Sequence, residues 1–322
     1  MSVRGWVRTV VVLSACVWGS GAGAQEDRAS DAQLTRHARG VVVYQGRAMQ
    51  GFGGSASGSD AYVDVLNTIR EAVGERATMY SIIVPTAQEF YLPEPGERER
   101  RNIAGTYARL APGIRTVDAH AEIAAHTDEH LYFRTDTHWT GLGGYYAYRA
   151  FCTAAGVEAM PLERMERRVI RTGWLGSLHR LTRDRTLRPD DVEIFVPPVE
   201  VEVRAPGRGG GPERTVPLFR ERSAGYTVFL GGDHPIMRLR TSVRNGRRAI
   251  LVKNSYGNAF AVQLVSNYEE LIFVDYRTFQ GSLLELLDES ERPTDLLFMN
   301  GSLTSNSRRH TAWMLEILRG RS

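Results

Sequence analysis

The chain has 322 residues, a length that fits one large α/β domain or two small ones. Its formal net charge of +3 is too small to indicate nucleic-acid binding, and no arginine-rich run is interleaved with aromatic residues. Lys253 is the only lysine, so the excess of arginine is read as a composition bias and not as phosphate recognition. We therefore expect no nucleic-acid partner.

Residues 1–24 have the order of a secretory signal peptide. Two arginines precede an apolar run at 10–18, and small residues follow up to Ala24. The apolar run is too short to span a bilayer permanently, so we expect cleavage after Ala24 and export to the periplasm or beyond, without a permanent transmembrane helix. A second interpretation stays open, because residues 13–16 resemble a lipobox and would make the protein a lipoprotein through Cys16.

The chain has two cysteines, Cys16 and Cys152. Removal of the signal peptide leaves Cys152 alone, so no intrachain disulfide can form even in an oxidising compartment. Cys152 falls in the apolar part of an expected helix, and we predict a buried, small hydrophobic side chain there.

After a polar segment at 25–39, which we expect to be flexible, strand and helix patterns alternate along the chain. The apolar run 80–84, ended by Pro85, is typical of a buried parallel strand. Asp60 is placed to cap a helix with an apolar face. The expected elements up to residue 162 are a strand at 41–44, a Gly/Ser-rich loop at 51–59, helices at 61–73, 97–110 and 141–155, and strands at 80–84 and 114–117.

Residues 163–240 have a different texture, with short strand-like pieces interrupted by Pro197-Pro198 and by the Gly/Pro run 206–212. We predict a smaller β-rich insertion with a flexible loop. Strands at 249–253, 271–275 and 295–299 then alternate with helices at 258–267 and 281–289. Residues 40–162 and 241–322 should thus form one α/β domain, with a mostly parallel sheet flanked by helices.

A carboxylate and an imidazole stand two residues apart in the stretch 133–146, which reads FRTDTHWTGLGGYY. On an extended loop, side chains at positions i and i+2 point the same way, so Asp136 and His138 can converge on one place. A carboxylate that orients a histidine is half of a hydrolytic triad.

A serine stands where the strand 249–253 gives way to the next helix, within Asn254-Ser255-Tyr256-Gly257-Asn258. Chemistry in an open α/β sheet gathers at the carboxyl ends of the strands, and backbone amides at such a turn can stabilise an oxyanion. A serine at a strand-to-helix junction is more often a helix N-cap. The separate Asp-x-His loop favours Ser255 as a nucleophile.

These motifs together resemble the DHHW family. Asp136-Thr137-His138-Trp139 stands where that family has Asp-His-His-Trp, and Gly231-Gly232-Asp233-His234-Pro235 is close to its Gly-Asn-His-Pro. The resemblance continues through 250–260 and 274–279. The chain departs from the family at Thr137, at Asp233 and at Asn254, where an aspartate is usual. The pattern is also similar to that of the periplasmic alginate O-acetylation proteins.

Both groups are SGNH-hydrolase-like, so the resemblance implies an SGNH-like α/β fold and a triad. Ser255 would be the nucleophile, His138 the general base, and Asp136 the group that orients His138. Resemblance to the alginate system also implies a membrane O-acyltransferase partner, because no acetyl-CoA is available outside the membrane.

Five further residues are candidates for binding the oxyanion or the substrate. Asn254 could bond an oxyanion or brace the turn, and Arg277 could bind substrate or pair with Asp275. Trp139 could stack on a sugar ring or pack in the core, and His234 could line the site or stabilise a turn. The set is Tyr256, through its backbone amide, with Asn254, Arg277, Trp139 and His234.

Several acidic and imidazole side chains precede the motif, but their spacing matches no compact metal motif such as His-Glu-x-x-His. We predict no metal and no cofactor. These residues are Asp118, His120, His126, Asp128 and His130.

The predicted function is exported, serine-dependent acyl transfer or ester hydrolysis on the O-acetyl groups of a cell-envelope or extracellular polysaccharide. Two alternatives stay open. One is a non-catalytic protein that binds glycan or assists its assembly on an SGNH scaffold, and the other is a metal-dependent hydrolase.

Overall fold

A computed structural model describes residues 34–93, 97–207, 210–223 and 225–321. The expected signal peptide at 1–24, its cleavage site, Cys16 and most of the expected flexible segment lie outside these residues. None of the helices formed by the described residues combines the length and the hydropathy that crossing a bilayer requires.

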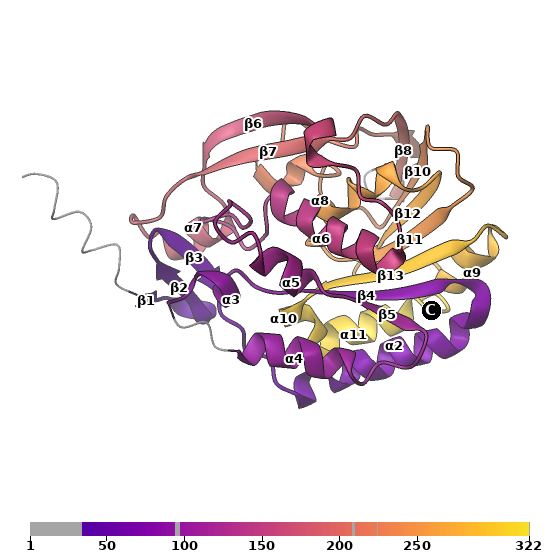
Figure 1. The fold of residues 1–322 in the computed structure, drawn as a ribbon, viewed down its shortest axis with the longest axis horizontal. Helices are drawn as coiled ribbons and strands as arrows, with labels where there is room; N and C mark the ends of the chain where they lie inside the picture. The colour runs from indigo at the N-terminus through magenta and orange to yellow at the C-terminus, as the bar shows by residue number, and fades with distance from the viewer. Residues whose placement is uncertain (1–33, 94–96, 208–209, 224, 322) are drawn as a thin grey trace, which may run out of the picture.

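The centre of the molecule is an eight-stranded sheet (Figure 1). The first five strands in spatial order run parallel, and the last three continue the sheet in antiparallel pairs. In spatial order the strands are β5 (Ile114–Val117), β4 (Thr78–Val84), β13 (Thr294–Gly301), β11 (Arg248–Lys253), β12 (Glu270–Asp275), β10 (Ile236–Thr241), β8 (Val201–Pro206) and β9 (Glu213–Thr215).

Helices cover both faces of this sheet, as its unbroken apolar strands require. The side chains of β11 alternate between two cores: Ala249 and Leu251 pack with one, and Ile250 and Val252 with the other. On the first face lie α5 (Ala119–Ala124), α6 (Gly141–Ala155) and α8 (Gly257–Ala261), and on the second α2 (Asp60–Val73), α4 (Arg98–Tyr107), α9 (Leu283–Asp288) and α11 (Arg308–Glu316) (Figure 1). The architecture is the mostly parallel sheet flanked by helices that the sequence predicted.

A three-stranded antiparallel sheet at the N-terminal end holds the loop that carries the Asp-x-His motif. The guanidinium of Arg47 donates to the carbonyl oxygen of Tyr132 at 2.6 Å, and the amide of Ala48 donates to that of Arg134 at 2.8 Å. The strands are β1 (Thr35–Arg36), β2 (Val41–Tyr44) and β3 (Arg47–Gln50).

The segment 163–240 contributes to two sheets. Its first two strands, β6 (Glu166–Trp174) and β7 (Asp190–Val196), pair only with each other, with α7 (Ser177–Thr182) between them in the chain. Its later strands, β8, β9 and β10, extend the central sheet. The division of the chain into domains stays a prediction.

Short helices complete the described structure. They are α3 (Gln88–Tyr91), α10 (Ser302–Ser305) and the 3-10 helices Ala38–Gly40, Ser57–Ser59, Gly74–Arg76, Leu162–Arg164, Gly225–Val228 and Leu264–Ser266.

Most elements agree with the sequence prediction, and two differ. Asp60 is the first residue of α2 and not its cap, because a 3-10 turn over Ser57–Ser59 leads into the helix. The helix predicted at 258–267 is wrong in length, since α8 ends at Ala261 and tighter three-residue turns follow. Apolar residues spaced three or four apart fit an α-helix and a 3-10 helix alike, so this pattern does not show where one gives way to the other. Cys152 is buried, as predicted.

Candidate functional site

The turn after β11 presents Ser255 at the carboxyl edge of the parallel strands. The side-chain oxygen of Asn254 accepts a hydrogen bond from the Tyr256 amide at 3.0 Å, and the Asn254 carbonyl accepts one from Gly257 at 3.1 Å. The amide nitrogen of the Asn254 side chain donates to Thr304 Oγ1 at 3.1 Å. Asn254 is 3% exposed, so the brace that holds Ser255 is almost entirely shielded from solvent.

Three side chains form a continuous hydrogen-bonded chain at this turn. His138 Nε2 lies 3.0 Å from Ser255 Oγ, and His138 Nδ1 lies 2.6 Å from Asp136 Oδ1. With the Nδ1 hydrogen donated to the carboxylate, Nε2 is free to accept the serine proton. The structure thus brings together Ser255, His138 and Asp136 from positions 117 residues apart in the chain.

The carboxylate of Asp136 is buried and fully engaged. Its Oδ1 also accepts from the His138 amide at 3.2 Å, and its Oδ2 accepts from the Ser177 amide at 2.8 Å. Burial raises the pKa of Asp136, but hydrogen bonds and charge attraction from His138, with the bonds from Ser177, outweigh it and hold the pKa well below its usual range. Gly176 packs so closely that a Cβ there would lie 2.7 Å from Asp136 Oδ2.

Tyr226 is a site residue that sequence reasoning missed. Its ring stacks on the His138 imidazole with 3.9 Å between centroids and 7° between planes, and its hydroxyl lies 2.9 Å from the Ser255 carbonyl oxygen. The Tyr226 side chain therefore contacts both the His138 imidazole and the Ser255 turn. The segment around Tyr226 has no motif that relates it to either, so the sequence carries no signal for this contact.

Two of the five further candidates have structural roles. Trp139 is fully buried in the core, and its indole nitrogen donates to the Tyr256 carbonyl at 2.9 Å, so it cannot stack on a sugar. The Tyr256 amide is already donated to Asn254, and the Tyr256 hydroxyl donates to the Thr137 carbonyl. These contacts tie the loop that carries Asp136 and His138 to the Ser255 turn.

Arg277 belongs to a charged network beside the turn. It pairs with the buried Asp275, at 2.8 Å from Nε to Oδ1, and with Asp233 at 2.7 Å. Burial alone would lower the pKa of Arg277, but the two carboxylates raise it above its usual value. Asn258 links Asp233 to Lys253, whose ammonium lies 2.6 Å from the Asn258 side-chain oxygen. Lys253 is 1% exposed, and burial lowers its pKa.

A cavity of about 410 Å³ opens over Ser255. Its lining includes residues at the carboxyl ends of four parallel strands. Of these residues, only those of the Ser255 turn and Arg277 were candidates from the sequence. The hydroxyl and amide groups on the remaining wall come from Gln50, Thr86, Thr137, Ser302, Thr304 and Ser307, and His310 and the apolar side chains of Val84 and Leu303 also line it. His234 does not line this cavity but a second one, on the other side of Asp233.

The imidazoles considered as metal ligands each bond a separate carboxylate. His120 pairs with Glu89, and His130 pairs with Asp190, each at 3.1 Å. His126 stacks on Tyr146. Across the part of the chain that the structure describes, no three histidine, cysteine or acidic side chains gather into a group that could hold a metal ion.

Similar structures are found among solved proteins. A DHHW family protein from Eubacterium siraeum is 27% identical, covers 89% of this chain and 98% of its own, and has a TM-score of 0.79. PatB1 from Bacillus cereus is 14% identical over 85% of this chain and 97% of its own, with a TM-score of 0.70. A weaker match, the O-acetyltransferase domain of Pseudomonas putida AlgJ, is 13% identical over 88% and 98%, with a TM-score of 0.48.

No curated protein matches the sequence. A family model described as DHHW protein matches residues 26–200, more than half of the chain, and includes the Asp-x-His-Trp motif. With that match and the structural similarity to a family member, the chain belongs to the DHHW family.

Proposed function

We propose that this protein is an exported SGNH-type O-acetyltransferase or acetylesterase that acts on polysaccharide. The observation that carries the proposal is the unbroken chain of hydrogen bonds from Ser255 through His138 to the buried Asp136. A serine within hydrogen-bond reach of an imidazole, which is itself oriented by a carboxylate, is the arrangement that nucleophilic serine chemistry needs.

The reaction would begin with attack of Ser255 Oγ on the carbonyl carbon of an acetyl ester. His138 Nε2 takes the serine proton as the new C–O bond forms, and it returns that proton to the departing alcohol oxygen as the old ester bond breaks. An acetyl-Ser255 intermediate remains. Water or a sugar hydroxyl then attacks this ester while His138 again accepts a proton. His138 returns that proton to Ser255 Oγ as the acyl C–Oγ bond breaks, which releases acetate or the acetylated sugar.

The negative charge that develops on the carbonyl oxygen needs donors already in place. The Ser255 amide has no hydrogen-bond partner among the described residues, and Ser255 lines the cavity. The Asn254 side chain already bonds Thr304 and Tyr276, and the Tyr256 amide is committed to Asn254. We assign the oxyanion role to the Ser255 amide.

The wall of the cavity favours a carbohydrate. Hydroxyl and carboxamide groups surround the nucleophile, and such groups match the hydroxyl-rich surface of a sugar. If the acetyl group passes to a sugar hydroxyl, it must come from a donor outside the cytoplasm. A membrane O-acyltransferase that delivers it is the partner that this version of the reaction requires.

The proposal is tested by the turnover of 4-nitrophenyl acetate. Ser255→Ala should lower the rate at least about a thousandfold, since the alanine side chain cannot form the acyl intermediate. The control Ser290→Ala removes a hydroxyl before β13, at the opposite edge of the sheet, and should keep the wild-type rate. A metal chelator should leave the rate unchanged. Wild-type turnover in folded Ser255→Ala protein would overturn the proposal, and loss with the chelator would favour the metal-dependent alternative.

A further inference from the structure

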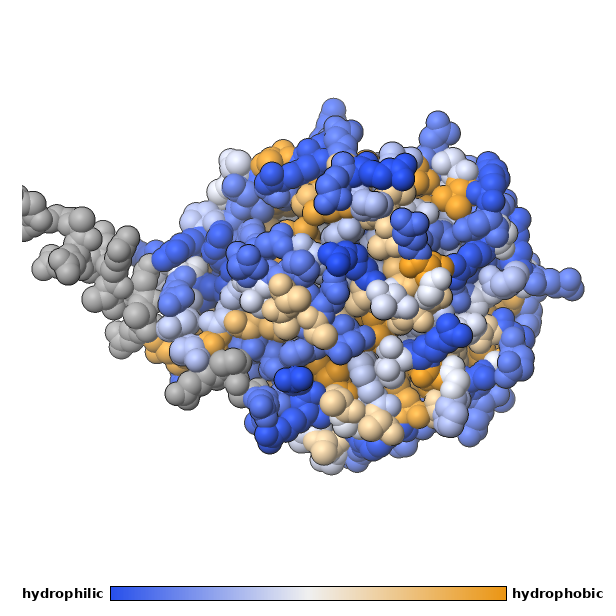
Figure 2. Space-filling model, viewed as in Figure 1, coloured by the Kyte–Doolittle hydropathy of each residue, from blue (hydrophilic) through white to orange (hydrophobic). Residues whose placement is uncertain are grey.

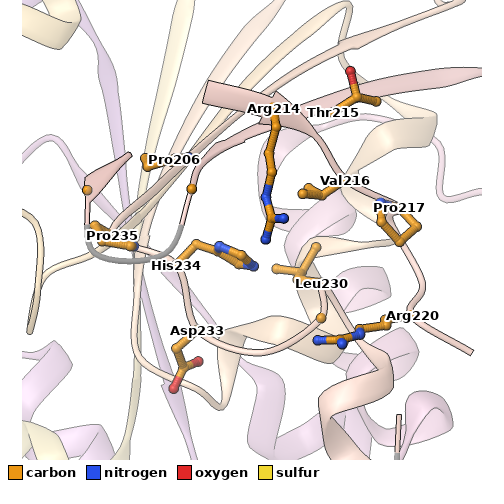
Figure 3. A pocket seen from close by; sticks show the side chains of 13 residues that line it. Pro206, Arg214, Thr215, Val216, Pro217, Arg220, Leu230, Asp233, His234 and Pro235 are labelled. Carbon is orange, nitrogen blue, oxygen red and sulfur yellow. The ribbon is translucent and has the colours of Figure 1, made fainter. Parts of the chain in front are cut away.

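A second imidazole lines the cavity over Ser255 and has no role in the chemistry above. It belongs to His310 in α11, which faces this cavity together with His138. His234 lies elsewhere, since Figure 3 shows its ring in the larger cavity of about 940 Å³, near the side chain of Arg214. Among the described residues, His310 is thus the second imidazole that a molecule bound at Ser255 can meet.

A short series of hydrogen bonds fixes which ring nitrogen of His310 carries the hydrogen. The Tyr276 hydroxyl lies 3.0 Å from His310 Nδ1, and Tyr276 is fully buried. The side-chain nitrogen of Asn254 donates to the Tyr276 hydroxyl, because the Asn254 side-chain oxygen already accepts from the Tyr256 amide. The Tyr276 hydroxyl therefore donates to His310 Nδ1, and the hydrogen of the neutral ring is on Nε2.

The ring of His310 is neutral near neutral pH. Burial lowers the pKa of His310, and the positive charges of Arg277 and Arg309 lower it further, against an opposite effect of Asp275. Burial also raises the pKa of Tyr276, so its hydroxyl keeps the hydrogen that it donates. Both groups are therefore in the protonation states that this series of hydrogen bonds requires.

The imidazole of His310 is held in place while its Nε2 is left without a partner. The rings of Tyr276 and Trp313 meet it edge to face, with centroids 5.9 Å and 5.2 Å away. In the described part of the chain, no hydrogen bond or ion pair joins Nε2 to another residue. A donor that is already in place loses little freedom when it binds a ligand.

We propose that His310 Nε2 donates a hydrogen bond to a hydroxyl or ring oxygen of the alcohol unit whose ester reacts at Ser255. This inference rests on the proposed function, because it assigns a contact to the same substrate. The acetyl carbonyl oxygen is placed against the Ser255 amide, so the alcohol unit is the part that extends into the rest of the cavity. His310 then selects esters of hydroxyl-bearing alcohols over esters of apolar alcohols.

Steady-state kinetics with two matched acetyl esters tests the selection. Methyl 6-O-acetyl-α-D-glucopyranoside has ring and hydroxyl oxygens, and cyclohexylmethyl acetate has a ring of the same size without them. His310→Phe should raise the KM of the sugar ester about five- to tenfold, the effect of losing one hydrogen bond. Its kcat should change little, because the contact is equally present before and during the reaction. The KM of cyclohexylmethyl acetate should change less than about twofold.

Two further variants separate this contact from a structural effect. His310→Gln can place an amide N–H near the position of Nε2 and should recover part of the affinity for the sugar ester. His126→Phe is the matched control, because it removes an imidazole that stacks on Tyr146 outside the cavity lining. It should leave the KM of both esters unchanged.

Nitrogen NMR of isotope-labelled Ser255→Ala protein tests the contact without turnover. The ring resonances of His310 should show a protonated Nε2 and an unprotonated Nδ1. Titration with methyl α-D-glucopyranoside should shift the Nε2 resonance.

A His310 ring protonated at Nδ1 instead of Nε2 would overturn the inference, as would an Nε2 resonance that saturating sugar does not move. Equal effects of His310→Phe on the two esters, or an equal rise in KM in His126→Phe, would overturn it too. Such results with Ser255-dependent turnover intact would leave the proposed function standing. A sugar-dependent shift in a protein whose wild type turns over neither ester would support the His310 contact and contradict the proposed enzyme.

Discussion

His138 is held by a hydrogen bond to Asp136 and by stacking against the Tyr226 ring. The bond to Asp136 at 2.6 Å is charge-assisted because its acceptor is an ionised carboxylate, and the Tyr226 ring covers one face of the imidazole. A protonated His138, as the proposed reaction forms it, would be stabilised both by the carboxylate and by the aromatic face. Tyr226 is thus a positioning residue whose removal should disturb His138 and the Ser255 turn together.

The lowered pKa of Asp136 predicts a pH dependence of stability. Its folded-state pKa lies below the unfolded value, so the carboxylate contributes stability that is full above about pH 4 and is lost as the pH falls toward the folded pKa. The contribution is on the order of 2 kcal/mol. Asp136→Asn should be less stable at about pH 7 and should lose less stability on acidification.

Urea denaturation of both proteins at about pH 7 and about pH 2, between which the carboxylate loses most of its contribution, measures this difference. Asp64→Asn, on the exposed side of α2, is the matched control and should follow the wild-type profile. Equal loss of stability on acidification in wild type and Asp136→Asn would contradict the explanation.

At the scale of elements, the contact between α6 and α8 joins the two halves of the site. The loop that carries Asp136 and His138 leads into α6, and the turn that carries Ser255 leads into α8. Gly144 lets the two helices touch. A Cβ at Gly144 would lie 2.7 Å from the carbonyl carbon of Ala259 and 2.9 Å from its Cβ. Backbone atoms cannot move aside as a flexible side chain can, so this contact fixes how closely the two elements approach.

Gly144→Ala should therefore destabilise the protein by about 1–3 kcal/mol, the usual cost of overpacking a core. Because the helices would be forced apart, the turnover of 4-nitrophenyl acetate should fall as well. Gly105→Ala in α4 is the control: nothing lies within 4 Å of its added methyl, and it should stabilise by about 0.5–1 kcal/mol. Thermal unfolding of both variants measures these changes. Equal stability of Gly144→Ala and wild type would show that the close approach of α6 and α8 does not depend on a glycine at this position.

How much of this could be read from the sequence depends on the kind of signal. Continuous apolar runs located β4, β11, β12 and β13, and the spacing of apolar residues matched α6 at both ends. The extension of the central sheet by β8, β9 and β10 was not expected from the sequence, because short, broken strand patterns do not reveal which sheet they join.

Residues of the site likewise differ in whether a local sequence pattern marks them. Asp136 and His138 stand two residues apart, and Ser255 follows an apolar strand, so local patterns made them candidates. Tyr226, Thr86 and Ser302 reach the site only through tertiary packing, which a single sequence does not record. Arg277 and Trp139 each had two open roles, and the choice between packing and exposure depended on neighbours far away in the chain.

At the scale of the whole molecule, the parallel strand order gathers the site at one edge. The carboxyl ends of β4, β11, β12 and β13 contribute Thr86, Ser255, Arg277 and Ser302 to a single cavity, as expected for an open α/β sheet. On the face that Figure 2 shows, the surface is largely hydrophilic, with smaller apolar areas between the hydrophilic ones. The cavity at this edge is open to the surface, and hydroxyl and amide groups stand among its apolar lining.

The central claim is that Ser255 is a nucleophile activated by His138. Reaction of the folded protein with a fluorophosphonate, followed by peptide mass spectrometry, tests it most directly, because the reagent modifies activated serines covalently. We expect one modified residue, Ser255, with modification lost in Ser255→Ala and slowed at least about a hundredfold in His138→Ala. An unmodified Ser255 in folded wild-type protein, or equal labelling in His138→Ala, would contradict it.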